Sequence, residues 1–279
     1  MPPAGETMDW ARVDVAVPRR SAWLPGVRMA GFRTHAPEPV DIAMVPHPAL
    51  TVLLDLSDGG DIVCDTGGRC LRGSFVAGIL PGELRTRGRI GGDCLQVRLS
   101  PVTAAAVLGA AAELSGNSVA LEEVWGRDAE RLRDRLRATS SWDDRFAIVA
   151  DTLRARLATP GVDPEVAHVW RRTRTGRGRV RVDGLADEVG WSRKRLWSRY
   201  RSQLGITPKR AAQLIRFDHA AHLLATGHST ALVAAACGYA DQSHLHRETR
   251  ALAGVTPPAI AAAPWLAIDP VAWPARSRP

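Results

Sequence analysis

The sequence has little of several features that would identify common classes of protein. It contains four cysteines in 279 residues, and their spacings fit no zinc-binding pattern. So low a cysteine content is typical of proteins in a reducing cytoplasm. No apolar run approaches the roughly 20 residues that cross a bilayer, and residues 1–20 lack the apolar segment of a secretory signal. These absences predict a cytoplasmic protein without a membrane span.

Patterns that would support catalysis are also missing. There is no Gly-x-Ser-x-Gly nucleophile elbow. His35, His47 and His168 precede residue 170 without a clustered set of metal ligands around them. His219 and His222 are three residues apart and could share a metal ion, but no second ligand pair accompanies them. Solvated histidines are the simpler interpretation, and we expect no enzyme, no cofactor and no metal site.

What the sequence does have is an uneven distribution of charge. It holds 37 Lys and Arg against 29 Asp and Glu, a net charge of +8, and its lysines are Lys194 and Lys209. Residues 170–279 carry 18 basic and 7 acidic residues, whereas residues 1–169 carry 19 and 22, so the net charges are +11 and −3. This asymmetry predicts that the C-terminal part binds a polyanion.

The N-terminal part has the patterns of an α+β domain. Alternation of Leu95, Val97 and Leu99 with polar residues predicts a strand with one buried face. The other predicted strands lie at 26–33, 50–56 and 74–79, with a hairpin joining 50–56 to 62–64 across a Gly-rich turn, and Gly and Pro clusters at 78–82 and 88–92 between strands. These segments predict a small antiparallel sheet or barrel.

Helical periodicity replaces the strand pattern after residue 100. We expect helices over 101–114, 121–137 and 143–157, each with an apolar stripe. The stripes either pack on the sheet or form a surface for self-association. Thr159-Pro160-Gly161 then breaks the pattern. The predicted organisation is a loose tail (1–21), a sensing or self-associating domain (22–158), an all-α domain (159–263) and a loose C-terminal tail (264–279).

The all-α domain contains one pattern written twice. LADEVGWSRKRLWSRYRSQLGITPKR begins at Leu185, and VAAACGYADQSHLHRETRALAGVTPPAI begins at Val233, at an offset of 48 that becomes 49 after the turn. Each copy predicts a short helix that ends at a glycine, then a second helix capped by Ser192 or Asp241. A helix, a tight turn and a second helix with a polar outer face form the helix-turn-helix arrangement.

One further segment joins the two copies of the repeat, and another precedes the first copy. The predicted helix over 208–225 spans about 27 Å at ~1.5 Å per residue, close to the roughly 34 Å between successive major grooves on one face of DNA. Residues 171–181 hold six arginines in eleven residues. This run either contacts phosphates or is a solvated linker, and the sequence favours neither interpretation.

The run ACGYADQSHLHRETRALAGVTP resembles the signature of AraC-type transcription regulators, as do the tandem spacing and the intervening helix. The resemblance covers about residues 164–263. Leu245 stands where that family has Phe or Leu, and Thr249 stands where it has a buried aromatic residue. The resemblance implies a bacterial, sequence-specific regulator that binds double-stranded DNA and is modulated through its N-terminal domain. It leaves RNA polymerase and a small-molecule effector open as further partners. The apolar stripes of the helices between 121 and 158 predict that it forms a homodimer.

Site residues follow from the outer faces of the two second helices. Arg pairs with guanine and Gln or Asn with adenine in the major groove. Together with the resemblance, this predicts base contacts by Lys194, Arg195, Ser198, Gln242, Ser243, His244, His246 and Arg247. The predicted phosphate contacts are Ser192, Arg193, Arg201 and Arg216. The alternatives are a small-molecule enzyme in the N-terminal domain delivered to DNA by the helical domain, and an architectural protein without sequence preference.

Overall fold

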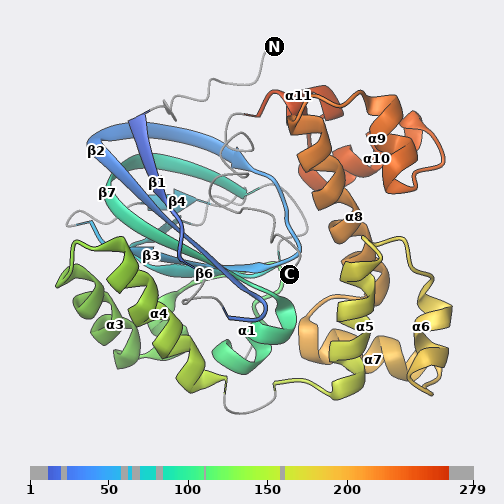
Figure 1. Cartoon of the computed structure of the whole chain (residues 1–279), viewed down its shortest axis with the longest axis horizontal. Helices are drawn as coiled ribbons and strands as arrows, with labels where there is room; N and C mark the ends of the chain where they lie inside the picture. The colour runs from blue at the N-terminus through green and yellow to red at the C-terminus, as the bar shows by residue number, and fades with distance from the viewer. Residues whose placement is uncertain are drawn as a thin grey trace.

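The computed structural model describes residues 12–19, 24–57, 62–64, 70–79, 84–109, 111–157 and 161–263. The strand-rich N-terminal part and the all-α C-terminal part lie side by side (Figure 1). The fold class is therefore α+β, as predicted.

An open antiparallel sheet forms the centre of the N-terminal part. Its strand order is β1-β2-β7-β3-β6-β8, and β4 and β5 pair separately. The strands are β1 (Val13–Ala16), β2 (Val27–Met44), β3 (Leu50–Asp55), β4 (Ile62–Cys64), β5 (Cys70–Arg72), β6 (Phe75–Ala77), β7 (Leu84–Leu99) and β8 (Ser118–Ala120). Because the order does not return to its first strand, this sheet is not a closed barrel.

Strand pairing differs from the prediction in three places. β3 pairs with β6 and β7, and β4 pairs with β5, so the expected hairpin between β3 and β4 is wrong. β7 continues through the Gly cluster at 88–92 because β2 pairs with it along both sides of a register shift. Residues 13–16 form β1 against β2 in the predicted N-terminal tail. Residues 1–11 and 264–279 of the two predicted tails lie outside the described residues.

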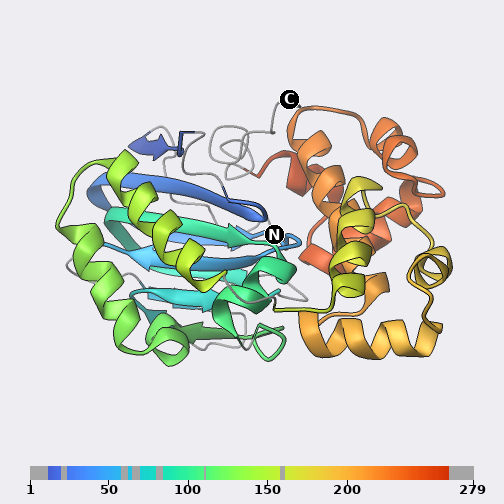
Figure 2. The same cartoon turned by 60° about the horizontal axis from the view of Figure 1, so that its bottom comes forward.

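Helices α1 (Pro101–Leu108), α2 (Leu121–Trp125), α3 (Arg127–Arg137) and α4 (Trp142–Arg156) accompany the sheet. The helix predicted over 101–114 stops at Gly109, which has a φ of +73°. The helix predicted over 121–137 is divided into α2 and α3 at Gly126, which has a φ of +55°. α3 and α4 lie together on one face of the sheet (Figure 2). A positive φ is incompatible with an α-helix and is readily adopted only by glycine, which explains both breaks.

The apolar stripes of α3 and α4 belong to the domain's own core. Leu132, Val149 and Leu153 line one apolar seam with Val52 and Val97 of the sheet. Each such side chain contributes about 1.5–3 kcal/mol when it is buried completely. Of the two interpretations of these stripes, packing on the sheet is the one that the structure shows.

A largely buried cluster of charged side chains links α4 to the sheet. Asp93 accepts hydrogen bonds from Arg33 Nε at 2.7 Å and from Arg145, whose side chain is 6% exposed. The hydrogen bond from Arg33 is the main cause that lowers the pKa of Asp93, and Arg145 lowers it further. The Trp142 ring lies over Gly31, where a Cβ would come within 2.3 Å of it. The cluster therefore fixes the start of α4 on strand β2.

The C-terminal part contains the helices that the repeat predicts. They are α5 (Pro164–Thr175), α6 (Val182–Glu188), α7 (Arg193–Leu204), α8 (Pro208–Ala225), α9 (Thr230–Cys237), α10 (Gln242–Ala253) and α11 (Pro257–Ala261). α8 is the predicted linker helix of 18 residues. None of the helices in the described ranges combines the length and the apolar character of a membrane span.

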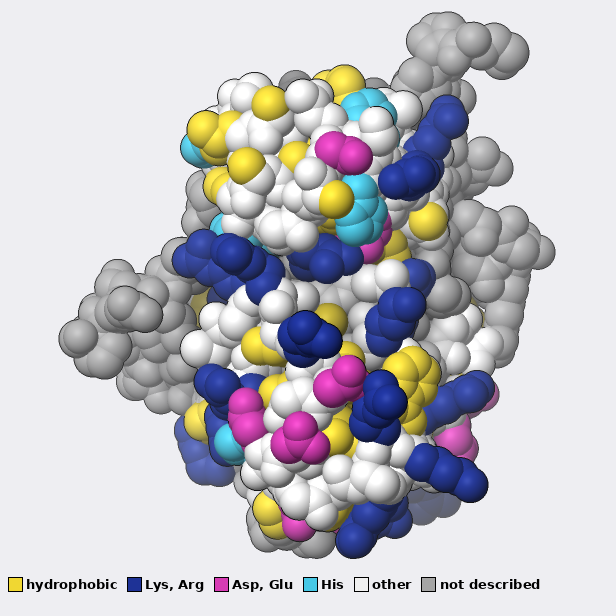
Figure 3. Space-filling model, turned by 90° about the vertical axis from the view of Figure 1, so that its right-hand side faces the viewer, with side chains coloured by type: hydrophobic (Ala, Val, Ile, Leu, Met, Phe, Trp, Pro, Cys, Tyr) yellow, Lys and Arg dark blue, Asp and Glu magenta, His cyan; other side chains and the backbone are white. Residues whose placement is uncertain are grey.

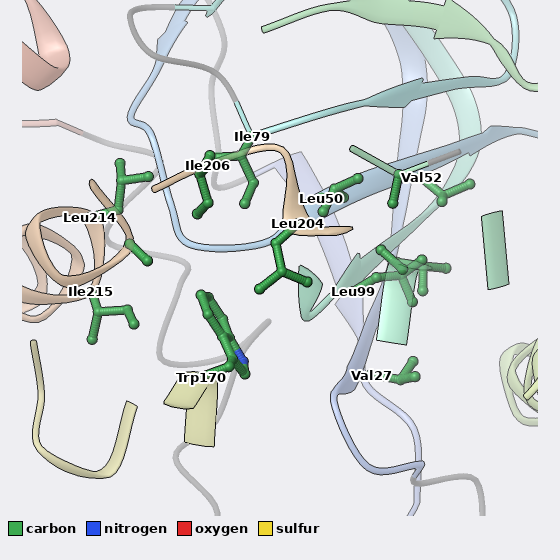
Figure 4. Close-up of a cluster of buried hydrophobic side chains, with 14 of the residues drawn as sticks. Val27, Leu50, Val52, Ile79, Leu99, Trp170, Leu204, Ile206, Leu214 and Ile215 are labelled. Carbon is green, nitrogen blue, oxygen red and sulfur yellow. The ribbon is translucent and has the colours of Figure 1, made fainter. Parts of the chain in front are cut away.

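One apolar core runs through both parts of the molecule. Leu204 and Ile206, at the end of α7, lie near Ile79 and Leu50 of the N-terminal part, with Trp170 of α5 beside Leu204 (Figure 4). These side chains are all less than a tenth exposed. The first half of the repeat is therefore packed against the N-terminal domain.

Close backbone contacts lie at the same boundary between the N-terminal and C-terminal parts. A Cβ at Gly205 would lie 2.7 Å from the carbonyl oxygen of Ala112, and one at Gly161 would lie 2.3 Å from the amide nitrogen of Ala106. Gly205 also has a φ of +74° as the C-cap of α7. The N-terminal domain therefore contacts the helical domain at the C-terminal end of α7, the second helix of the first copy of the repeat.

Candidate nucleic-acid interface

The two copies of the repeat have the same local construction. Turns at Gly190 and Gly238 have φ of +66° and +76°. Ser192 Oγ then accepts the amide of Arg195 at 3.2 Å, and Asp241 Oδ1 accepts the amide of His244 at 2.7 Å. These caps satisfy donors that a helix N-terminus otherwise leaves unpaired. The predicted starts of α7 and α10 are confirmed.

Each second helix buries one side and exposes the other. Leu196 and Tyr200 of α7, and Leu245 and Thr249 of α10, are completely buried. This apolar side holds each helix against its neighbours. The opposite side is left for contact with a partner, which is the arrangement that a recognition helix requires.

Five predicted DNA-contacting side chains lie exposed on α7: Arg193, Lys194, Arg195, Ser198 and Arg201. The guanidinium of Arg195 lies 4.6 Å from the ring centroid of Trp191, which orients it. Ser192 is exposed as well, but its hydroxyl caps the helix.

Arg193 has a protein partner on the neighbouring helix. Its Nη1 donates to Asp183 of α6 at 2.9 Å, and both side chains are more than half exposed. An exposed pair of this kind is worth little, so it leaves Arg193 able to exchange Asp183 for a phosphate.

On α10, Gln242, Ser243 and Arg247 are exposed. With His246 and Arg250 they line one open hollow beside the helix. The amide oxygen of Gln242 accepts a hydrogen bond from Thr230 at 3.1 Å. This hollow brings four of the five base contacts predicted for the second copy together on one surface.

His244 and Arg216 lie apart from that hollow. The His244 ring meets Tyr239 edge-on at 5.2 Å between centroids. The Arg216 guanidinium donates to both carboxylate oxygens of Glu248, and only 17% of its side chain is exposed. Sequence position alone placed Arg216 among the phosphate contacts. In the structure its partner is the carboxylate of Glu248, which is 7% exposed.

Trp197 and Arg250 were not predicted as site residues. Trp197 is 38% exposed on α7, between Lys194 and Arg201 along the helix, which is a large exposure for an indole ring. Arg250 lies in the hollow beside α10. Helical spacing from the buried Leu196 and Tyr200 would have placed Trp197 at the edge of the outer side.

The arginine-rich segment 171–181 packs on the linker helix. Arg177 Nη1 lies 3.1 Å from His219 Nε2 of α8, and a Cβ at Gly178 would come within 2.2 Å of the Ala212 carbonyl oxygen. A Cβ at Gly238 would lie 3.2 Å from the Arg179 side chain. Residues 171–175 are thus the end of α5, and residues 176–181 form a turn that packs on α8 and approaches the Gly238 turn of the second unit.

A surface ion cluster joins α5 to α6. Glu188 accepts hydrogen bonds from Arg172 and from His168, and these bonds, that of Arg172 first, lower its pKa to about 2. The carboxylate is therefore charged throughout the neutral range. It neutralises part of the positive charge of α5.

Among the charged side chains on the face of the helical domain in Figure 3, positive ones predominate. Figure 3 shows Lys and Arg side chains from one end of this face to the other, with fewer Asp and Glu among them. The distribution agrees with the net charge of +11 for residues 170–279. A surface of this sign attracts the phosphate backbone of nucleic acid without regard to sequence.

Comparisons with known proteins place the repeat in a family. The profile of the family described as "Helix-turn-helix domain" matches residues 185–262. No curated protein sequence matches the chain.

Three solved structures are similar in fold at low identity. ToxT from Vibrio cholerae O395 has 11% identity and a TM-score of 0.47, over 86% of this chain and 98% of that one. The C-terminal domain of AraT from Geobacillus stearothermophilus has 20% identity and a TM-score of 0.35, over 36% and 86%. The AraC-like transcriptional activator CuxR has 16% identity and a TM-score of 0.32, over 70% and 82%.

The assignment of function rests on the matched residues and on the geometry of α6–α7 and α9–α10. Residues 185–262 therefore form a helix-turn-helix domain, the kind of unit that places its second helix in the major groove of DNA.

Proposed function

We propose that α7 and α10 read two successive major grooves on one face of the operator. The observation that carries this proposal is the connection between them. One continuous helix, α8, of 18 residues separates the two helix-turn-helix units. At ~1.5 Å per residue it is about 27 Å long. Thr207 caps its own start, and Ser229 caps the start of α9 just beyond its end.

Within this proposal the predicted site residues divide into two groups. The base readers are Lys194, Arg195, Ser198, Gln242, Ser243, His244, His246 and Arg247, with Trp197 as an apolar neighbour. Ser192, Arg193 and Arg201 supply phosphate contacts, which set position and affinity rather than sequence preference. Arg216 stands apart from both groups, because its guanidinium is paired with Glu248.

We further propose that the N-terminal domain, residues 22–158, regulates the DNA-binding domain, residues 159–263, in the bacterial cytoplasm. The shared core around Leu204 and Ile206 supports this coupling. A small-molecule effector would be the partner that supplies the signal, and RNA polymerase would be the partner that responds to it. A homodimer would form through surfaces other than the stripes of α3 and α4, since these stripes are buried within the chain.

The test is selection of bound fragments from a random DNA pool, followed by footprinting on the selected site. We expect two protected major-groove segments about 10.5 base pairs apart. One protected segment would contradict reading by both helices. Equal recovery of unrelated sequences would identify an architectural protein instead. A turnover assay of the whole chain with candidate metals and small molecules tests the enzyme alternative, for which we expect no activity.

A further inference from the structure

The second recognition helix lacks the large anchor of the first. Tyr200 of α7 and Thr249 of α10 occupy equivalent positions of the repeat, and both are completely buried. Thr249 is much smaller than Tyr200, and its hydroxyl donates back to the Leu245 carbonyl of its own helix at 2.8 Å. The Tyr200 hydroxyl has no hydrogen-bond partner among the described residues, so the two positions differ in the size of the packed side chain and not in a polar link. The smaller Thr249 leaves the orientation of α10 more dependent on other contacts.

An ion pair occupies the adjacent position in both copies. Arg199, which precedes Tyr200, donates to both oxygens of Asp163 at 2.8 and 2.9 Å, at the start of α5. Glu248, which precedes Thr249, accepts from Arg216 of α8, with Nε at 3.1 Å from Oε1. Each pair joins a second helix to the helix that precedes its helix-turn-helix unit. The signs of the charges are exchanged between the copies.

The two pairs differ in burial. The side chains of Arg199 and Asp163 are 50% and 28% exposed, whereas those of Arg216 and Glu248 are 17% and 7% exposed. An exposed pair contributes little. Removal of one member of a buried pair leaves the other charged and unpaired in a poorly hydrated place, which is costly.

Contacts on the other sides hold Arg216 in place. Its guanidinium lies 4.8 Å from the ring centroid of Tyr239, and that ring meets His244 edge-on in the first turn of α10. On the backbone side, a Cβ at Gly178 would lie 2.9 Å from the Arg216 amide nitrogen. Arg216 and Glu248 therefore link the linker helix to the turn and to the recognition helix of the second unit.

We propose that Glu248, through Arg216, is the positioning residue that orients α10 in the major groove, and that Arg216 acts in this pair rather than on a DNA phosphate. The proposal rests on the reading of two grooves proposed above. It takes the place of the earlier prediction that Arg216 is a phosphate contact. It also explains how the second unit stays ordered with threonine in place of the tyrosine.

The experiment compares Glu248→Gln and Arg216→Gln with the matched variant Arg199→Gln of the exposed pair. Binding is measured on three DNAs: the selected site, the site with its first half scrambled, and the site with its second half scrambled. Each titration is repeated from low to moderate salt. Circular dichroism confirms the helical content of every variant.

For Glu248→Gln and Arg216→Gln we expect discrimination of the second half-site to fall about tenfold, as when one base-reading pair is lost. Discrimination of the first half-site and the salt slope should not change. Arg199→Gln should leave second-half discrimination as it is. The charge-exchanged double variant, Arg216→Glu with Glu248→Arg, should recover part of the lost discrimination.

The proposal is overturned if Arg216→Gln lowers the salt slope by about 1 and weakens all three DNAs alike, which is the behaviour of a phosphate contact. Unchanged second-half discrimination in Glu248→Gln overturns it as well. If that variant does not fold, Glu248→Asp keeps the charge with a shorter reach and is judged by the same criteria. Failure of the unmodified chain to distinguish the second half-site would instead contradict the reading of two grooves.

Discussion

Single side chains on α10 and α7 differ in whether they contact bases, and so contribute to sequence specificity, or contact phosphates, and so contribute to affinity alone. Arg247 lies on the exposed side of α10 beside Gln242, where a guanidinium can form two hydrogen bonds to guanine. We expect Arg247→Ala to reduce the ratio of specific to random binding by the equivalent of ~1–3 kcal/mol. The measurement is a titration on the selected site and on a scrambled site.

Arg201 supplies the matched control, because it is exposed near the far end of α7, beyond the first turns that usually reach bases. Arg201→Ala should weaken binding to both DNAs about equally and lower the salt slope by about 1. An unchanged specificity ratio in Arg247→Ala would make α10 a packing or phosphate-binding helix.

At the scale of elements, the attachment of α4 to the sheet depends on one carboxylate. Asp93 joins Arg33 of β2 to the buried Arg145 of α4, so Asp93→Asn should lower the free energy of unfolding by on the order of 2 kcal/mol at neutral pH. Denaturant titration measures this. Asp143→Asn, in an exposed pair with Arg19, should cost no more than about 0.5 kcal/mol.

The same cluster gives a pH dependence of known sign. Because hydrogen bonds from Arg33 and Arg145 lower the pKa of Asp93, its stabilisation is complete above the ordinary aspartate pKa of about 3.9 and is lost as pH falls through the folded value. The difference in stability between wild type and Asp93→Asn should therefore shrink below about pH 4. A difference that persists unchanged at pH 3 would show that packing, and not charge, causes it.

Elements held by local chemistry could be predicted, and those held by distant partners could not. Ser192, Asp241 and Thr207 cap their helices within three residues of chain, so the sequence alone locates them. β3 instead pairs with β6 and β7, and nothing near residue 50 specifies those partners. The pairing of Arg216 with Glu248 could not be predicted for the same reason, since the two residues are 32 positions apart.

At the scale of the whole molecule, two glycines with similar backbone angles should respond differently to alanine. Gly190 has a φ of +66° with nothing near its missing Cβ, whereas Gly205 has a φ of +74° and lies against Ala112. Gly190→Ala should cost about 1–2 kcal/mol of stability, the penalty for a left-handed residue. Gly205→Ala should cost more in the whole chain, measured by thermal unfolding, because it also displaces the N-terminal domain.

The isolated fragment 160–263 provides the complementary test. We expect it to fold and to bind the selected site, since it contains both complete helix-turn-helix units. It should melt at a lower temperature than the whole chain, because Leu204, Ile206 and Trp170 lose their cover. In this fragment the costs of Gly205→Ala and Gly190→Ala should become equal. An unfolded fragment would show that the two parts form a single cooperative unit.

The scarcity of lysine makes the first recognition helix chemically distinguishable from the rest of the surface. Lys194 is exposed on the outer side of α7, and Lys209 is exposed in the first turn of α8. An amine-selective acylating reagent would therefore modify few positions besides these two and the chain's α-amino group. Mass spectrometry of the digested protein could then follow occupancy of the first half-site through Lys194, with Lys209 as an internal standard. The chain thus carries its own reporter of operator binding, without an added label.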